Sequence, residues 1–386
     1  MSATSRGEAV VVATARTPIG TARRGSLTDV DAFRLATIAV GEAVERAGVD
    51  PSLIDDVVLG ESLYGGGAIA RYAAIEAGLA HVPGMAHNRH CASGLATVQT
   101  AAASIMAGME RVVVAGGVQS SSTAPRCSWQ GEEDWVAWSH RETPEAPARD
   151  MTITVGWNTA RDAGISREDM DVWALRSHQR AIAGIDSGAF VDEIVAVGDF
   201  VVDEHPRRDT TLEKLAALPP LHPEIDGFSI TAGNAAGRND GAAAVVLADR
   251  ALAEAEGMAP LAVIRSWASV GVPPERTGLA PIDAIPRALD RAGITAADVD
   301  LWEINEAFAS VPIAAVRALG LDEERVNVLG SGCSLGHPIA MTGTRMVITL
   351  VHELRRRGGG AAVAAMCAGG GMAEAVVLDV TAGATG

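Results

Sequence analysis

Strand-like and helix-like segments alternate along the 386 residues, and this order predicts an α/β protein with a mainly parallel or mixed sheet. The expected strands are short apolar runs at 9–13, 57–59, 111–115, 242–247, 261–264, 361–365 and 375–378. Helical periodicity lies between them, at 31–47, 94–108, 282–292 and 342–357. An internal repeat and a globular composition support the same class.

The repeat consists of two similar stretches separated by 245 positions (43 to 288 and 61 to 306). AVERAG at 43–48 and VVLGE at 57–61 return as ALDRAG at 288–293 and WEINE at 302–306. The same offset carries Cys91 to position 336, next to His337. We therefore expect two related α/β halves, each with a reactive loop at the same topological place. Chance similarity is the alternative, since Ala, Arg and Gly are common at helix ends.

The middle of the chain differs from both halves. Trp, Pro and Glu are frequent in SWQGEEDWVAWSHRETPEAPARD at 128–150, and a helical run, ISREDMDVWALRSHQRAI, follows at 165–182. We predict an N-terminal half over 1–118 completed by about 240–258, an inserted domain over 119–239, and a C-terminal half over 259–386. The alternative is a long connection that only covers the core, but a structureless connection of that length is unusual.

Composition and charge exclude several functions. Apolar residues make up 48% and charged residues 20%, which is typical of a globular protein. The formal net charge of −17 argues against binding to nucleic acid or a membrane surface, because both need a basic field. The four cysteines lie far apart, and neither a signal peptide nor a membrane-spanning run is evident. We expect a soluble, cytoplasmic protein with reduced thiols.

Three segments carry residues that suit catalysis. Cys91 in NRHCASG precedes an expected helix, whose positive end would favour a nucleophilic thiolate; a small buried cysteine is the alternative. The glycines after Cys367 in CAGGG can aim N–H groups at an oxyanion, or form only a turn between strands. Asn305 in NEAFA is expected at the C-terminal end of a strand, where α/β sheets bind ligands, or else begins a helix.

The stretch SGCSLGHPIAMTG at 331–343 places Cys333 near His337 in a glycine-rich loop. A histidine there suits an acid, a base or a metal ligand. His87 and His90 have a metal-like spacing, but no third ligand cluster accompanies them, so we predict no metal site. The sequence contains neither the Gly-x-x-x-x-Gly-Lys phosphate loop nor a dinucleotide-binding pattern.

Taken in order, HCASG, TAGNAAGRNDGAAA, NEAFA, GHP and CAGGG resemble the thiolase family, which makes or cleaves 3-ketoacyl-CoA. The resemblance covers nearly the whole chain, from AVVVATARTPIG to CAGGGMAEAVVL. It implies a thiolase-like fold with two duplicated halves in a layered αβαβα core, and an inserted loop domain that binds coenzyme A. It also implies acyl-CoA and CoA as substrates, no tightly bound cofactor, and a homodimer or homotetramer.

The resemblance assigns roles to the same residues. Cys91 would accept the acyl group as a thioester, and His337 would favour its thiolate. Cys367 would exchange a proton with the α-carbon of the second acyl-CoA. Asn305 would hold a water that forms one oxyanion site with His337, and the backbone N–H groups of Cys91 and Gly369 would form the other. Two cysteines fit this chemistry, because the thioester step and the α-proton step make different demands.

The resemblance also points to substrate-binding residues, and some of them depart from the family pattern. It implies coenzyme A binding by Arg207, Arg208, Ala232, Gly233 and Ala236, and an acyl pocket near Met151 and Thr277. The two arginines fit a solvated polar turn equally well. Ala236 replaces the family's serine, and Thr277 its methionine, so we expect an altered acyl pocket, larger or suited to branched chains. Cys333 lies where the family commonly has an apolar residue and is expected to be buried outside the chemistry.

Two other functions compete with this one. An acyl-carrier-protein-dependent condensing enzyme shares the fold and the cysteine, but such enzymes generally complete the site with histidines or asparagine, so Cys367 favours a thiolase. A thiolase-like subunit that binds coenzyme A without chemistry should tolerate loss of catalytic residues. Cys91, Asn305, His337 and Cys367 are all present.

Overall fold

A computed structural model describes residues 7–64, 68–133, 135 and 137–383. Within these residues one mixed sheet runs in the order β4-β3-β5-β6-β1-β7-β10-β9-β8, with β2 paired to β6 beside this path. The strands are β1 (Ala9–Arg16), β2 (Gly20–Thr21), β3 (Asp56–Gly60), β4 (Gly84–His87), β5 (Val112–Ser120), β6 (Asn239–Asp249), β7 (Ala262–Gly271), β8 (Leu301–Ile304), β9 (Gly360–Ala368) and β10 (Met372–Val380).

The sheet consists of two halves with the same internal order. In the first half β5 is parallel to β3 and antiparallel to β6, and in the second β9 is parallel to β8 and antiparallel to β10. The halves meet at β1 and β7, through the pairs Val10 with Val263 and Val11 with Ala262. The matched order confirms the predicted duplication of an α/β unit.

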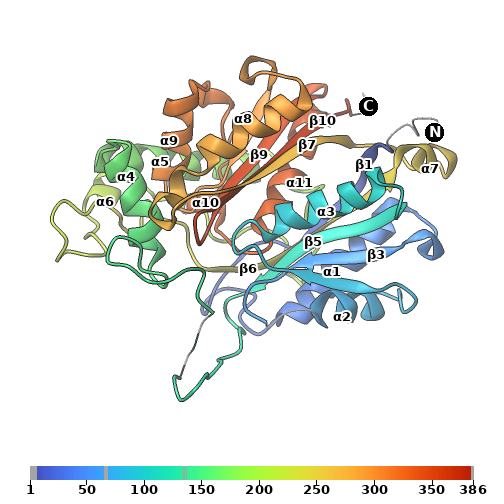
Figure 1. The fold of residues 1–386 in the computed structure, drawn as a ribbon, viewed down its shortest axis with the longest axis horizontal. Coiled ribbons are helices and arrows are strands. Elements are labelled where there is room, and N and C mark those ends of the chain that lie inside the picture. The colour runs from blue at the N-terminus through green and yellow to red at the C-terminus, as the bar shows by residue number, and fades with distance from the viewer. Residues whose placement is uncertain (1–6, 65–67, 134, 136, 384–386) are drawn as a thin grey trace.

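Helices complete five layers, which Figure 1 shows from top to bottom. The outer helices α8 and α9 cover one half of the sheet, α3 and α11 fill the middle, and α1 and α2 cover the other half (Figure 1). The helices are α1 (Ala32–Ala47), α2 (Ala68–Glu76), α3 (Ser93–Met106), α4 (Asn158–Asp162), α5 (Arg167–Asp186), α6 (Leu212–Ala216), α7 (Arg250–Ala255), α8 (Pro281–Ala292), α9 (Ser310–Leu319), α10 (Gly332–Leu335) and α11 (Thr342–Arg357). This is the predicted αβαβα arrangement.

The central helices touch each other at glycines. A Cβ at Gly94 would lie 2.8 Å from the backbone nitrogen of Thr344, and one at Gly343 would lie 2.5 Å from that of Leu95. Because no side chain fits there, the first turns of α3 and α11 come into direct backbone contact. The loops that precede the two helices are therefore brought to the same place, and these loops carry Cys91 and His337.

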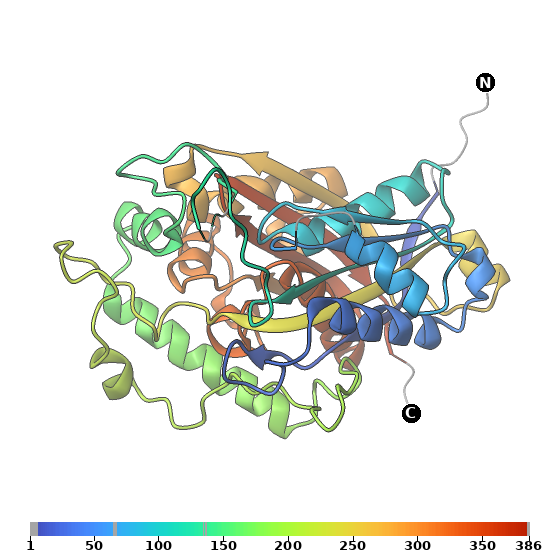
Figure 2. The ribbon, with the colours of Figure 1, turned by 90° about the horizontal axis from the view of Figure 1, so that it is seen from below.

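The segment between β5 and β6 lies outside the sheet. Figures 1 and 2 both show its helices α4, α5 and α6, in green to yellow-green, toward one end of the molecule. It contains α4, α5, α6 and a π-helical turn, Thr152–Trp157. The predicted helical run is confirmed as α5, which begins at a capping box formed by Ser166 and Asp169. The boundaries of the three predicted units stay a prediction, and β4, α2 and α9 were not predicted.

Candidate active site

Cys91 lies in the loop between β4 and α3, two residues before the helix begins. The preceding residue, His90, has a φ of 46°, an unusual conformation for a residue with a side chain. Ser93 closes this turn, because its Oγ donates to the carbonyl of His90 and accepts from the N–H of Arg89. The turn leaves Cys91 partly exposed, whereas most of α3 is buried.

Cys91, Cys367 and Gly369 lie close together. Desolvation raises the pKa of the Cys91 thiol to about 11, and hydrogen bonds from the backbone N–H groups of Gly369 and of Cys91 itself oppose this rise. Desolvation also raises the pKa of Cys367, and the nearby charge of Cys91 adds to it. The expected lowering of the Cys91 pKa by the helix end is therefore outweighed by desolvation.

Asn305 and His337 form a second group, completed by Thr342. The His337 Nδ1 atom lies 2.7 Å from Thr342 Oγ1, whose own proton is donated to the Pro338 carbonyl. Nδ1 must therefore be the protonated nitrogen, and Nε2 carries the lone pair. Nε2 lies 3.5 Å from Asn305 Nδ2. Desolvation, and then the charge of Arg345, lower the pKa of His337 to about 3, so the ring is neutral and its unprotonated Nε2 accepts from Asn305 Nδ2.

The C-terminal ends of strands β8 and β9 bring the Cys91 group and the His337 group to the same edge of the sheet. Asn305 follows β8, and its N–H donates to Ala365 of β9, the strand that carries Cys367. The two residues thus lie at the C-terminal ends of neighbouring parallel strands, the edge where α/β sheets bind ligands. The Oδ1 atom of Asn305 is buried without a hydrogen-bond partner among the described residues. A polar atom left in this state is a site for a water or a substrate oxygen.

The TAGNAAGRNDG motif holds the histidine loop in place. Asn239 Oδ1 accepts the N–H of His337, and the left-handed Gly336 packs so closely on Asn239 that a Cβ would lie 2.4 Å from Oδ1. The N–H of Ala236 donates to Ala307 of the NEAFA motif. Motifs far apart in the sequence therefore support one another around the histidine.

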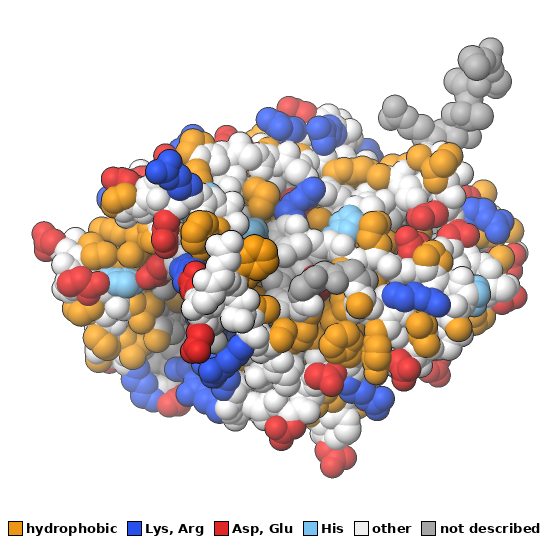
Figure 3. All heavy atoms as spheres, turned by 60° about the horizontal axis from the view of Figure 1, so that its bottom comes forward, with side chains coloured by type: hydrophobic (Ala, Val, Ile, Leu, Met, Phe, Trp, Pro, Cys, Tyr) orange, Lys and Arg blue, Asp and Glu red, His pale blue; other side chains and the backbone are white. Residues whose placement is uncertain are grey.

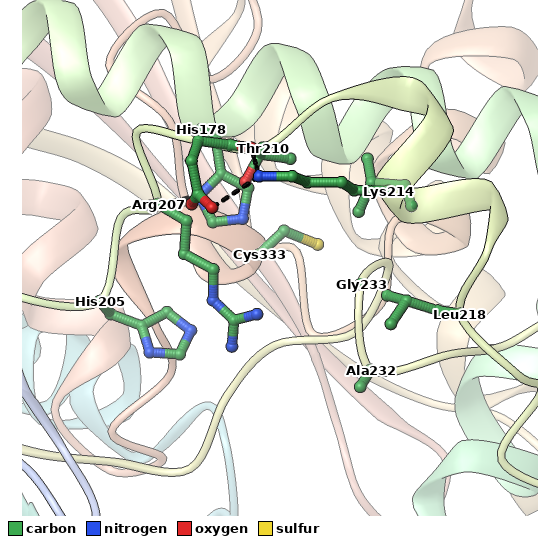
Figure 4. Close-up of a pocket in the computed structure, with 11 residues that line it drawn as sticks. His178, His205, Arg207, Thr210, Lys214, Leu218, Ala232, Gly233 and Cys333 are labelled. Atoms are coloured by element: carbon green, nitrogen blue, oxygen red, sulfur yellow. Dashed lines mark hydrogen bonds and ion pairs between the residues drawn. The ribbon is translucent and has the colours of Figure 1, made fainter.

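A pocket of about 120 Å³ lies against the same loop, on its side toward the middle segment (Figure 4). Figure 4 shows the side chains of His205, Arg207 and Lys214 around it, with Cys333 at its wall. Desolvation lowers the pKa of His205 to about 4, so Arg207 and Lys214 supply the positive charge. Lys214 is paired with Asp209.

The structure brings together some of the predicted coenzyme A ligands. Arg207, Ala232 and Gly233 line this pocket. Arg208 lies outside it and forms an exposed ion pair with Asp186. Cys333 is buried, as expected, and it lines the pocket.

The two predicted acyl-pocket residues lie around the CAGGG loop. A Cβ at Gly369 would lie 3.7 Å from Met151 Sδ, which places the methionine beside that loop. Thr277 Oγ1 donates to the Pro274 carbonyl and accepts the N–H of Gly371 at 2.9 Å. Thr277 therefore holds the backbone of the loop through a hydrogen bond that the family's methionine does not form.

Sequence reasoning missed Thr342, Asn239 and Lys214. Thr342 and Asn239 stand inside motifs that were singled out, SGCSLGHPIAMTG and TAGNAAGRNDG, but no local pattern showed what they contact. Among the residues that the structure describes, no group of three His, Cys, Asp or Glu side chains is arranged to hold a metal ion. No helix in the described part of the chain is long and apolar enough to span a membrane.

Known proteins match this chain over nearly its full length. Residues 9–251 match the family model for the thiolase N-terminal domain, and residues 258–380 that for the thiolase C-terminal domain. The 3-ketoacyl-CoA thiolase of Bacillus subtilis is 41% identical, over 97% of this chain and 99% of its own. The acetyl-CoA acetyltransferase of Cupriavidus necator is 40% identical, over 96% of this chain and 99% of its own.

Solved structures also match this chain over nearly its full length. Human mitochondrial 3-ketoacyl-CoA thiolase superposes with a TM-score of 0.90 at 36% identity, covering 98% of this chain and 100% of the other. The acetyl-CoA acetyltransferase of Bacillus anthracis gives a TM-score of 0.88 at 38% identity, covering 97% and 99%. The chain belongs to the thiolase family. It is an acyltransferase of the thiolase type.

Proposed function

We propose that this acyltransferase cleaves 3-ketoacyl-CoA with free CoA, and runs the reverse Claisen condensation, through a thioester on Cys91. The observation that carries the proposal is the cluster of Cys91, Cys367 and the Gly369 N–H. The neutral His337 belongs to the same strand edge, because its neighbour Asn305 is hydrogen-bonded to Ala365 of the strand that carries Cys367. The unprotonated Nε2 of the neutral His337 ring supports its role as the base that takes the Cys91 proton.

The two oxyanion sites are proposed on the same geometry. The N–H groups of Cys91 and Gly369 point at the reactive sulfur and would stabilise the oxyanion of the thioester step. The unpartnered Oδ1 of buried Asn305 supports the binding of a water beside His337 for the enolate step. Cys367, next to Cys91 and also protonated at rest, would exchange the α-carbon proton.

The test is thiolysis of purified protein across 3-ketoacyl-CoA substrates of graded length and branching. We expect turnover with at least one of them, and the hydrogen-bonding Thr277 predicts a preference that differs from that for short unbranched chains. No cleavage of any chain length would contradict the proposal. Comparing acyl-CoA with acyl-carrier-protein donors in condensation tests the rival enzyme class, which predicts a preference for the carrier protein.

We propose that the nucleotide end of coenzyme A binds at the pocket around Arg207. Arg208 and Lys214 are each paired with an aspartate, whereas no salt bridge of Arg207 is found in the described part of the chain. An unpaired guanidinium suits a phosphate. Ala232 and Gly233 at the wall leave room for the ligand. We propose no tightly bound cofactor beyond this substrate.

The pocket assignment is tested by two neighbouring arginines. Arg207→Met is expected to raise the KM for CoA about tenfold, because a charge-assisted contact to phosphate is lost. Arg208→Met is the matched control and should change the KM by no more than about twofold, since an exposed ion pair contributes little. An equal effect of both changes on the KM would contradict the assignment.

We propose that the protein forms a homo-oligomer, because one edge of its sheet is lined by exposed apolar side chains. Strand β4 is one of the two edge strands in the described sheet order, and Tyr72, Ile75 and Met85 around it are between 43% and 45% exposed. An edge with apolar neighbours suits pairing with a second copy across a two-fold axis. Light scattering should therefore give the mass of a dimer or tetramer, and Met85→Asp should lower it. A monomeric mass for the unaltered protein would contradict the proposal.

The remaining predictions concern cellular context. Acidic and basic side chains are interspersed on the face in Figure 3, with no continuous basic field, which supports the proposal that nucleic acid and membrane surfaces are not partners. All four cysteines are free, which supports a cytoplasmic location. A role in fatty acid or other lipid metabolism follows from the proposed substrates.

A further inference from the structure

A partly buried charge cluster beside the Cys91 loop is not used by the mechanism above. It consists of Arg89 of the loop, Gln99 of α3, Ser269 of β7 and Glu374 of β10. Glu374 is flanked by apolar residues in the strand MAEAVVLDV, and its side chain is fully buried, whereas the strand's other acidic residue, Asp379, is partly exposed. A carboxylate in such a place needs a specific reason, because burying a charge is unfavourable unless it is paired.

The contacts of Glu374 converge on one oxygen. Its Oε1 accepts from Gln99 Nε2 at 2.7 Å and from Ser269 Oγ at 2.9 Å, and it forms an ion pair with Arg89. Arg89 Nη1 also donates to Ser269 Oγ at 2.9 Å. Arg89 is the cation of this cluster, and Gln99 and Ser269 keep the carboxylate oriented toward it. The cluster therefore anchors the Arg89 side chain to the second half of the sheet.

The anchored residue belongs to a strained turn. His90 has its left-handed φ of 46°, and this conformation persists only when the surroundings fix it. On one side of His90, the Arg89 side chain is held by Glu374, and on the other side Ser93 binds both Arg89 N–H and the His90 carbonyl. Cys91 lies between these two fixed points.

The other end of the anchor lies on the hairpin that carries Cys367 and Gly369. In the β9–β10 pairing, Ala373 stands opposite Cys367, and Glu374 is the next residue of β10. Gly369 lies in the turn of the same hairpin. The ion pair thus connects the loop of the first cysteine directly to the hairpin of the second cysteine and of the proposed oxyanion donor.

We infer that Arg89 and Glu374 are positioning residues, which hold Cys91 at its working distance from Cys367 and the Gly369 N–H. The inference rests on the proposed nucleophilic role of Cys91. The Arg89 guanidinium and the Glu374 carboxylate are bound to each other and to Ser269, so the pair acts on the rate of acyl transfer and leaves acyl-CoA binding unchanged. Small errors in the placement of a nucleophile cost large factors in rate, which makes the effect measurable.

The test measures acetylation of Cys91 by acetyl-CoA in the full chain, by rapid quench and mass spectrometry, together with steady-state kcat and KM. Glu374→Gln and Arg89→Met are expected to slow acetylation by about tenfold to 100-fold, with the KM within about twofold. Arg89→Lys keeps one charge against Glu374 and should retain the rate within about threefold. The matched control is Asp379→Asn, which breaks the exposed pair of Arg265 on β7 with Asp379 on the same strand β10.

These measurements distinguish a role of Arg89 and Glu374 in positioning Cys91 from a role only in the stability of the fold. A melting temperature that falls without any change in the acetylation rate relative to Asp379→Asn would overturn the inference. If Glu374→Gln does not fold, Arg89→Met decides, because Arg89 has a 36% exposed side chain and can be replaced without a buried cavity. An unaltered protein that forms no adduct on Cys91 would overturn the proposed function itself, and the inference with it.

Discussion

The loops before α3 and α11 occupy equivalent places in the two halves of the sheet, yet their environments differ. The first leaves Cys91 partly exposed in a strained turn, and the second encloses His337 so fully that 8% of its surface remains accessible. Cys91 has a raised pKa and His337 a lowered one, both mainly because of desolvation. Both groups are therefore neutral near pH 7.

Under the proposed mechanism, this difference lets one duplicated scaffold supply two chemical roles. The proposed nucleophile Cys91 must meet an incoming acyl group, which suits an open loop held by side chains at its ends. The proposed base His337 must present one ring nitrogen, which suits a closed loop whose tautomer is set by Thr342. Neutral partners can exchange a proton only as the acyl group arrives, which limits side reactions of the thiolate.

The largest expected effect comes from removing the base. His337→Ala should lower kcat on the order of 10²-fold or more, because general-base assistance to Cys91 is lost. Mass spectrometry should show that the acetyl adduct on Cys91 still forms, only slowly. In Cys91→Ala, the matched control, the adduct should be absent. Normal turnover in His337→Ala would break the proposed division of roles.

The second prediction concerns pH. The rate at which iodoacetamide alkylates Cys91 in the free enzyme should rise about tenfold per unit between pH 7 and 9, because a thiol below its pKa gains thiolate in that proportion. His337 has a pKa lowered to about 3 and does not titrate in this range. The measurement is the rate of alkylation at Cys91. This site is identified as the one whose alkylation is lost in the Cys91→Ala variant. A plateau near pH 7 would mean that the helix end outweighs desolvation.

A smaller loss of kcat is expected when the hydrogen bond that fixes the His337 tautomer is removed. Thr342→Val removes the acceptor of the His337 Nδ1 proton, and we expect kcat to fall about tenfold, as for other groups that orient a catalytic imidazole. Thr342→Ser retains the hydroxyl and serves as the control, with a kcat close to that of the unaltered enzyme. Steady-state thiolysis measures both. Equal losses in the two variants would point to packing of the threonine methyl group instead.

The smallest effect is expected at Cys333, the other reactive side chain of the second loop. Its thiol is buried, with a pKa raised by desolvation and then by the charge of Glu306. Cys333→Ala should therefore leave kcat within about threefold, since an inert thiol takes no part in proton transfer. A rise in the KM for CoA would be consistent with its place at the pocket wall. A loss of kcat as large as that of His337→Ala would place it in the chemistry.

Much of the fold was predictable because its signals are local. The strand at 9–13, the helix at 342–357 and the 245-residue offset (43 to 288) all appear in the structure. Strand β4 was missed because GMAH is short and lacks an apolar alternation. The pKa direction of Cys91 was missed because a helix end is visible in sequence, whereas desolvation by distant segments is not.

The sequence by itself determined the family and the duplicated α/β order, and it predicted the reactive side chains, because each depends on residue types in sequence order. Only the tertiary structure decided which atoms meet. It placed the His337 proton on Nδ1, separated Arg207 from Arg208, and tied Arg89 to a glutamate far along the chain. Charge, tautomer and strain depend on neighbours that the fold brings from elsewhere, and no local pattern records them.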